Sequence, residues 1–518
     1  MTTTTRTPSF ATSLTQHAGT KESSPRRAAL LAACVGFFVI VLDTTVVNVA
    51  LPSIGHQLHA GLAGLEWIVD GYVVIFAALL LSSGTLSDRF GASRTLAGGL
   101  IGFTLASAAC GLAPSLPYLL AARVLQGAAA AVTLPASLAL VRQAFEGANE
   151  RARAIAIWTA GGGAAVAAGP VIGGLLTGAI GWRAIFFVNL PVGVVGLVAL
   201  SRALPSSRRR VQLDLAGQIT AVAAVAGLAL GVIEGGHHGF GSPIALAALA
   251  IFALAASAFV AIERRVPVAM VPLDIFRSRT VSSTTVTGLI LNFAFYGEVF
   301  VLSLFFQQTL GRSPAVTGLM FVPMTALVAG VNLLAGRLVQ RCGPRLPLLI
   351  GQLVLAGGLL GLLAVGHNSP TVLIEVLLVP VGIGAGLTIP PLTTAFMDDI
   401  RAEQAGLGAG VLNSSRQLGS ALGVAVFGAV VSTNLTSGLR VSLLLGASTV
   451  LATASLTVRY VRSGPTSPIR NGLSDADEHT GQSPGAKTLE PTGAACGDHN
   501  GLALTLEAAP VRSHSISS

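Results

Sequence analysis

The octapeptide GTLSDRFG at residues 84–91 recurs as GRLVQRCG at residues 336–343, an offset of 252 residues. The tripeptide TLP at residues 133–135 recurs as TIP at residues 388–390, at the nearly equal offset of 255. Two matches at almost one offset indicate an internal duplication. The sequence therefore predicts two equivalent halves that follow one another along the chain.

The composition indicates a membrane protein. Of the 518 residues, 52% are hydrophobic and only 10% are charged, and the mean hydropathy is +0.75. Soluble proteins carry about 25% charged residues, so a soluble enzyme, a disordered chain and a coiled coil are all excluded. The net charge of +9 comes mainly from arginines spread between apolar runs, whereas a nucleic-acid-binding protein gathers them on one face. The expected surroundings are a lipid bilayer.

Apolar segments long enough to cross a bilayer, which takes about 20 residues, can be counted directly. There are fourteen, at residues 28–51, 65–86, 93–113, 116–141, 154–178, 184–201, 215–234, 243–262, 280–308, 315–336, 346–366, 371–397, 405–432 and 439–459. The ninth begins 252 residues after the first, so the duplication covers six segments on each side of a two-segment insert. Since eight segments separate equivalent helices, the halves have the same orientation, as in transporters with parallel repeats.

The predicted fold is an all-α polytopic membrane protein with two six-helix bundles and a two-helix central insert. Its parts are a disordered N-terminal tail, a first bundle, a linker that carries the insert at about 215–262, a second bundle and a disordered C-terminal tail, at residues 1–27, 28–202, 203–279, 280–460 and 461–518. Every second loop between the apolar segments would lie on the same side of the membrane, and the loops of one side hold most of the arginines. The loops of the other side hold only Arg183, Arg312 and Arg440. The positive-inside rule then places both termini in the cytoplasm of a bacterial cell, with the chain in its cell membrane.

Five motifs in this order resemble the major facilitator superfamily, and more narrowly its fourteen-span drug:proton antiporter family of multidrug and antibiotic exporters. They are LDTTVVNVALP at 42–52, the loop motif at 84–94, LAARVLQG at 120–127, GPVIGG at 169–174 and GWRAIFFVNLPVG at 181–193. Two positions depart from the family pattern. Ala184 stands where an aromatic residue is common, and Gln340 replaces the acid of the second loop motif.

The resemblance implies roles for two groups of residues. The loop between the second and third segments would act as a conformational switch through charge contacts, with the residues Gly84, Asp88, Arg89, Gly91 and Arg94. The exporter motif would let helices approach and slide, because its glycines lack side chains and its proline kinks the helix. Its residues are Gly169, Pro170, Gly173 and Gly174.

Charged residues within apolar segments indicate proton coupling independently of the family resemblance. Asp43 lies in an apolar segment, where an ionised acid costs at least about 2.5 kcal/mol. Asp43 and Arg123 both lie about 12 Å from the outer ends of their segments at the helical rise per residue, so they can form an ion pair that protonation breaks. A fixed structural pair is the alternative. Glu298 is a third candidate for proton coupling, and its alternative role is an acid satisfied by Asn292 or a neighbouring helix.

A substrate cavity is expected between the halves. Its predicted polar and aromatic residues are Asn48, Asp70, Tyr72, Gln126, Asn292, Phe295 and Tyr296. The acids near the outer half favour a neutral or cationic substrate over an anion. We expect Arg416 to be structural, and His237 and His238 to be solvated in an outer loop.

Other chemistry finds little support in the sequence. No set of metal ligands, cofactor motif or nucleophile–base pair is recognisable, and residues 481–488 lack the second glycine of a phosphate-binding loop. Without ATP, transport must use an ion gradient. The sequence thus predicts a monomeric, non-enzymatic, proton-driven exporter of a bulky hydrophobic compound such as an antibiotic. The alternatives are a transporter of a lipid, siderophore or metabolite on the same fold, or a membrane sensor that transports nothing and needs no intramembrane acid.

Overall fold

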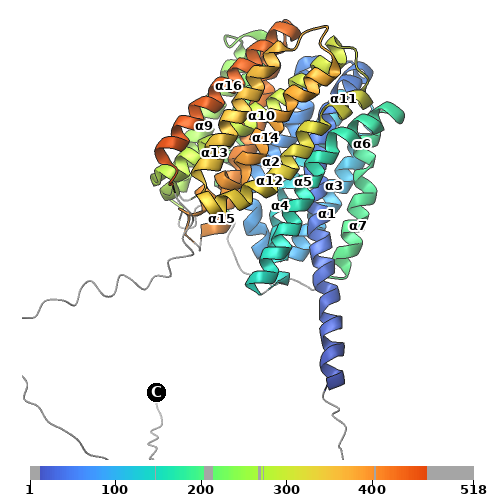
Figure 1. The fold of residues 1–518 in the computed structure, drawn as a ribbon, viewed down its shortest axis with the longest axis vertical. Coiled ribbons are helices and arrows are strands. Elements are labelled where there is room, and N and C mark those ends of the chain that lie inside the picture. The colour runs from blue at the N-terminus through green and yellow to red at the C-terminus, as the bar shows by residue number, and fades with distance from the viewer. Residues whose placement is uncertain are drawn as a thin grey trace, which may run out of the picture. The chain divides into compact units, whose positions relative to one another are not determined.

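The computed structural model describes residues 12–145, 147–203, 214–266, 270–271, 273–401 and 404–463, which all belong to one compact unit, Met1–Thr466. The elements in this part of the chain are all helical (Figure 1). The predicted C-terminal tail from residue 464 onward lies outside the described residues, as do residues 1–11 of the N-terminal tail. Helix α1 begins at Thr12 and so includes residues 12–27, which the sequence analysis places in the disordered tail.

The helices divide into two halves and an insert. The first half contains α1 (Thr12–Leu58), α2 (Leu62–Phe90), α3 (Ala92–Gly111), α4 (Leu116–Ala144), α5 (Ala148–Ala179), α6 (Ala184–Phe187) and α7 (Asn189–Ser201). The insert is α8 (Leu215–His238) with α9 (Pro243–Glu263). The second half contains η1 (Leu273–Arg277), α10 (Arg279–Leu304), η2 (Phe305–Thr309), α11 (Pro314–Met320), α12 (Val322–Cys342), α13 (Arg345–Gly361), η3 (Leu362–Ala364), α14 (Thr371–Met397), α15 (Ala405–Val431) and α16 (Leu435–Tyr460).

Packing within each half follows the 252-residue offset. Helix α1 packs against α5, α4 and α7, and α10, the helix at the equivalent position, packs against α15, α14 and α16. The turn at the end of the repeated octapeptide is also made in the same way in both halves. It is made by Gly91 (φ 89°) and by Gly343 (φ 74°), in a conformation that side chains other than glycine rarely adopt.

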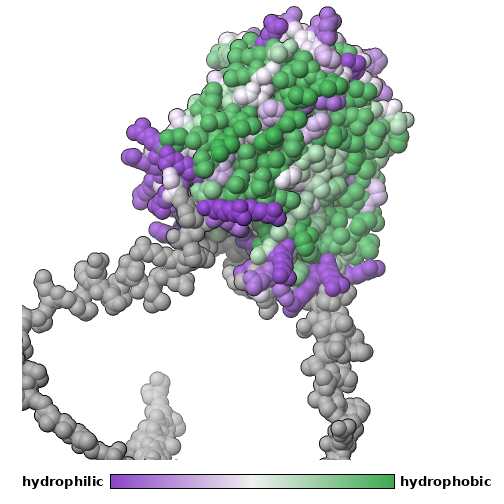
Figure 2. All heavy atoms as spheres, viewed as in Figure 1, coloured by the Kyte–Doolittle hydropathy of each residue, from purple (hydrophilic) through white to green (hydrophobic). Residues whose placement is uncertain are grey.

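The surface is apolar where a bilayer would surround it. Figure 2 shows a broad hydrophobic band between hydrophilic residues at the two ends of the helices. In the part of the chain that the structure describes, twelve helices are long and apolar enough to cross a membrane. Helices α3 and α15 are not among the twelve, although they have 20 and 27 residues and pack against α4 and α10.

The insert packs against both halves. Helices α8 and α9 pack on each other, and α8 also contacts α2 and α15. The side chain of Gln218 donates a hydrogen bond to the carbonyl of Ala78 on α2 at 3.0 Å. Both insert helices start at capping side chains, Asp214 and Ser242, which accept hydrogen bonds from backbone N–H groups of the first turn.

The connections α1–α2, α8–α9 and α15–α16 lie near one end of the bundle. Glu66 lies next to Gly428, and the Gly236 backbone approaches Ala429. We call this the outer end, following the predicted orientation, and the opposite end, where the α2–α3 turn lies, the inner end.

Candidate functional site

The predicted ion pair exists at the centre of the first half. Arg123 on α4 contacts Asp43 on α1, with 2.5 Å between Nη1 and Oδ2. Both side chains are buried, at 1% and 0% exposure. The guanidinium also donates to the carbonyl of Ile68 at 2.9 Å and to Gln126 Oε1 at 2.7 Å. A buried pair is favourable only when its remaining hydrogen-bonding atoms are satisfied, and these contacts meet most of that requirement.

The second carboxylate oxygen of Asp43 is held by two amides. Gln126 Nε2 and Asn189 Nδ2 donate to Oδ1 at 2.8 and 3.0 Å. Both amides also donate to Ser107 Oγ, at 2.9 and 3.3 Å. Four helices of the first half, α1, α3, α4 and α7, therefore meet at one buried network. Asn189 and Ser107 were not predicted as site residues, although Asn189 lies within the motif at 181–193.

An aromatic residue of α2 separates this network from the second half. The Tyr72 ring lies 4.4 Å from the Arg123 guanidinium carbon, a distance at which a cation–π interaction forms. Its hydroxyl is buried without a hydrogen-bond partner among the described residues. The close approach of α2 to α4 depends on Gly127, since a Cβ there would lie 2.4 Å from the Tyr72 carbonyl oxygen.

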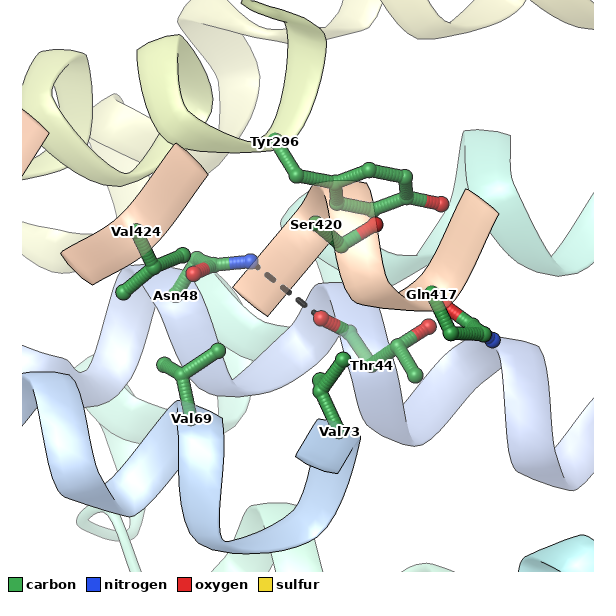
Figure 3. Close-up of a pocket in the computed structure, with 8 residues that line it drawn as sticks. All are labelled: Thr44, Asn48, Val69, Val73, Tyr296, Gln417, Ser420 and Val424. Carbon is green, nitrogen blue, oxygen red and sulfur yellow. Dashed lines mark hydrogen bonds between the residues drawn. The ribbon is translucent and has the colours of Figure 1, made fainter. Parts of the chain in front are cut away.

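A small cavity lies between the halves, next to Tyr72. Its walls come from α1, α2, α10 and α15, and the lining residues are Thr44, Asn48, Val69, Val73, Tyr296, Gln417, Ser420 and Val424 (Figure 3). The free volume is about 10 Å³, which is about the space that the centre of one water molecule needs. A bulky molecule therefore requires a different conformation.

Only two of the seven predicted cavity residues, Asn48 and Tyr296, line this cavity. Tyr72 and Gln126 belong to the Asp43 network. Phe295 packs edge-on against the Tyr296 ring, with 5.3 Å between centroids, and Asn292 donates to the carbonyl of Gly288 on its own helix.

Two predicted acids are buried without partners. In the described part of the chain, neither oxygen of Asp70 or of Glu298 has a hydrogen-bond partner, and the residues are 0% and 2% exposed. Glu298 lies one helical turn after Ala294, whose Cβ faces Gly446 of α16. Glu298 is thus on the side of α10 that packs inside the second half.

A contact that the sequence analysis missed joins α2 to the insert. Nε2 of His237 lies 3.0 Å from Oε1 of Glu66, and the two side chains are 14% and 0% exposed. The expectation of a solvated His237 is therefore wrong, because the last turn of α8 continues to His238 and places the ring against α2. His238 is 65% exposed and contacts Glu234.

The two halves contact one another both toward the outer end and farther in. Ser303 Oγ donates to the carbonyl of Asn48 at 2.7 Å, and Gln307 Nε2 donates to that of Val49 at 2.9 Å. Farther in, α2 and α15 still touch, where Ser414 Oγ donates to the carbonyl of Ala77. Near the inner end, no atom of the described residues lies within 4 Å of a Cβ built at Gly336 or at Gly406.

The exporter-motif residues lie at close helix contacts. A Cβ at Gly169 would meet Thr45, and one at Gly173 would lie 2.6 Å from the carbonyl oxygen of Val46 on α1. Gly174 faces the second half, where a Cβ would lie 2.5 Å from the Pro314 carbonyl oxygen. On the same contact, Gly318 of α11 approaches the carbonyl of Pro170. The motif thus supports both the internal packing of the first half and its contact with the second.

The predicted switch loop forms the α2–α3 turn. Gly91 supplies the turn, Arg89 and Arg94 are exposed, and Gly84 is exposed with no atom within 4 Å of a Cβ placed on it. The side chain of Asp88 lies outside the described residues. Arg89 lies over the Phe90 ring at 5.5 Å.

In the second half, where Gln340 replaces the acid, charge contacts at the inner end come from another loop. Asp399 accepts a hydrogen bond from Ser278 at 2.7 Å and lies 3.9 Å from Arg462. Partial burial, and then the neighbouring Asp399, raise the pKa of Asp398.

Comparisons with known proteins agree with this architecture. The sequence profile of the Major Facilitator Superfamily matches residues 33–424. The chain is 41% identical to the multidrug resistance protein Stp of Mycobacterium tuberculosis over 412 residues, which cover 79% of this chain and 76% of that protein. It is 36% identical to the methylenomycin A resistance protein of Streptomyces coelicolor over 416 residues, 80% of this chain and 87% of the other.

Solved structures share the fold at low sequence identity. A D-xylose-proton symporter superposes with a TM-score of 0.62 at 14% identity, covering 85% of this chain and 98% of its own. A bacterial homologue of the human lysosomal transporter Spinster, in an inward-facing and occupied conformation, gives 0.62 at 16% identity, over 86% and 99%. At this identity the likeness concerns the fold alone.

Proposed function

Because the chain belongs to the Major Facilitator Superfamily, whose members are transporters rather than enzymes, we propose that it exports a hydrophobic small molecule from a bacterial cell in exchange for protons. Relatives named for multidrug resistance and methylenomycin A resistance support export as the direction. In this proposal the chain works as a monomer in the cell membrane and does not use ATP. The observation that carries the coupling to protons is the buried ion pair of Asp43 and Arg123.

We place fourteen helices across the membrane, with both termini in the cytoplasm. The twelve strongly apolar helices would be joined by α3 and α15, which are long enough to span and pack within the halves. Charged or polar side chains lower their hydropathy, for example Arg94 in α3 and Arg416 in α15. The insert would then add one hairpin, and the second half would keep the orientation of the first.

The proposed proton step takes place at Asp43. With the pair intact, the carboxylate balances the guanidinium, and the network holds α1 against α4 and α7. Protonation of Asp43 would remove that balance, and Arg123 would keep only the Ile68 carbonyl, Gln126 and the Tyr72 ring. Since the Tyr72 ring lies against the Arg123 guanidinium and the next residue, Val73, lines the cavity, movement of the guanidinium would reach the substrate site. Glu298 and Asp70, buried without partners, are further proton-binding candidates.

The conformation described here fits one state of an alternating-access cycle. The halves are joined at the outer end through Ser303 and Gln307, while a Cβ at Gly336 or at Gly406 near the inner end would meet no atom of the described residues. Wider opening at the inner end would then admit cargo from the cytoplasm to the cavity, which is too small for it in the present conformation. Release to the outside would require the outer contacts to separate, including the approach of Gly174 to Pro314.

Transport in proteoliposomes tests this function. The purified chain would be reconstituted and given an acidic lumen, and uptake of ethidium, pyrenebutyramide and pyrenebutyrate would be compared with protein-free liposomes. Accumulation of at least one probe above the protein-free level, abolished by a protonophore, is the expected result. One proton moving down 100 mV supplies about 2.3 kcal/mol, enough for roughly a 50-fold gradient at about 1.4 kcal/mol per tenfold. Uptake of all three probes independent of the pH gradient would refute proton coupling.

A further inference from the structure

We propose that the cargo of this protein carries an acidic group and that Arg416 of α15 binds it. Arg416 follows Asn413 by three residues and precedes the cavity-lining Gln417 and Ser420 on the same helix. It lies eleven residues from Ala405, or about 16 Å from the inner end of α15 at the helical rise.

The guanidinium of Arg416 has no counter-ion. No hydrogen bond or ion pair joins it to any described residue, and its Nε atom is buried without a partner. Arg123, the other arginine deep in a helix, has an acid, an amide and a carbonyl as partners. Arg416 is partly buried, and a cation within a membrane-spanning helix is unfavourable when no partner compensates its charge. A ligand that brings a negative charge to Arg416 would remove this cost.

The groups around Arg416 favour the same charge. Its stem packs against α10, the helix of Tyr296, where Cγ lies 3.4 Å from a Cβ built at Gly288. Figure 3 shows the Tyr296 hydroxyl and the Gln417 side chain on one side of the cavity. Both can donate a hydrogen bond to an anion, so a carboxylate in the cavity would have a hydroxyl and an amide as partners, and the proposal adds Arg416, which precedes Gln417 on α15.

The acids that suggested a cationic cargo do not face this cavity. The residues lining it include no Asp or Glu. Asp43 is neutralised by Arg123, Glu66 contacts His237, and Glu298 lies on the side of α10 that faces α16. Asp70 is on α2 between the lining residues Val69 and Val73, but it is fully buried and does not line the cavity. No acidic side chain of the cavity lining therefore opposes an anionic cargo.

Matched acid and amide probes test the assignment. The full-length chain in nanodiscs at pH 7.5 would be titrated with 1-naphthaleneacetate, anthracene-9-carboxylate and pyrenebutyrate, and with the primary amide of each. The wild type should bind at least one of the acids tenfold or more tightly than its amide, because charge-assisted hydrogen bonds are the strong ones. Arg416→Gln should abolish this preference and leave amide binding within about twofold. Arg416→Lys should keep part of the preference for the acid, since lysine retains the positive charge but lacks the planar guanidinium that donates two parallel hydrogen bonds to a carboxylate.

Arg440→Gln is the matched control, because it removes one exposed arginine from α16 and should leave the preference unchanged. Equal binding of every acid and its amide by the wild type, binding of none of the acids, or an equal loss of acid and amide binding in Arg416→Gln would overturn the inference. The inference rests on the proposed function only in taking the cavity as the cargo site. A preference for the acid in binding, together with no pH-driven transport, would refute proton coupling and leave the Arg416 assignment intact.

Discussion

Oε1 of Glu66 and Nε2 of His237 lie 3.0 Å apart, although 171 residues separate them in the sequence. This contact joins α2 of the first half to α8 of the insert, beside Gly428 of the second half. The insert is therefore attached at a point where three parts of the chain meet, near the outer end.

Removal of this contact should weaken the fold. His237→Ala leaves the buried Glu66 carboxylate without its partner, so we expect a loss of about 1–3 kcal/mol in the free energy of unfolding. Thermal unfolding of the purified protein in detergent would report it as a lower midpoint. His238→Ala is the control, because that exposed histidine should contribute less than about 0.5 kcal/mol. Equal midpoints for the two variants would show that the Glu66–His237 contact contributes nothing to stability.

Cysteine labelling can decide the number of spans. In a cysteine-free background, Gly241→Cys between α8 and α9 should react with a membrane-impermeant maleimide from outside the cell. Ser201→Cys and Ser463→Cys should react only after the membrane is opened. Reaction of all three from the same side of the membrane would mean that α8 and α9 do not cross it, and the fourteen-span arrangement would be incorrect.

The close approach of Gly174 to Pro314 should control the closure of the outer end. In Gly174→Ala the new methyl group would lie 2.5 Å from the Pro314 carbonyl oxygen, so the halves must separate there. Spin labels at Gly61→Cys and Thr433→Cys, on opposite halves, would show a longer distance distribution than the parent. Gly178→Ala, one turn further along α5, meets Ala315 at an ordinary 3.5 Å and should leave the distribution unchanged. An unchanged distribution in Gly174→Ala would refute a role for this contact in closure.

The two members of the buried ion pair should differ in their effect on stability. Arg123→Gln leaves the Asp43 carboxylate with amide partners only, and an uncompensated buried charge costs about 3–5 kcal/mol. Asp43→Asn should cost less, because Arg123 keeps the Ile68 carbonyl, Gln126 Oε1 and the Tyr72 ring. Chemical denaturation of both variants in detergent measures the difference. A larger loss for Asp43→Asn would contradict this description of the network.

Much of the fold could be predicted because apolar length, arginine placement and the repeat are local properties of the sequence. The contact between Asp43 and Arg123 could also be expected, since two opposite charges at equal depth in apolar helices need partners. What could not be predicted was which side of a helix faces the cavity. Tyr72 and Gln126 have the residue types of a binding site, but helix rotation places them in the Asp43 network.

His237 was missed for a different reason. Its sequence neighbourhood, GGHHG at residues 235–239, resembles a loop, and only the packing of α8 against α2 shows that the helix continues to His238. Arg416 was identified in the sequence and was expected to have a structural role. The lack of a counter-ion among the described residues became visible only when its surroundings were known.

The central claim is that the Asp43–Arg123 pair couples protons to transport, and substrate-induced proton movement tests it most directly. Proteoliposomes loaded with pyranine would be exposed to whichever probe the wild type transports, and the internal pH would be followed. Substrate should cause a pH change with the wild type and with the control Asp214→Asn, whose acid caps α8 outside the network. Asp43→Asn, folded and inserted, should give no substrate-induced pH change. A pH change of wild-type size in Asp43→Asn would contradict the assignment of coupling to this pair.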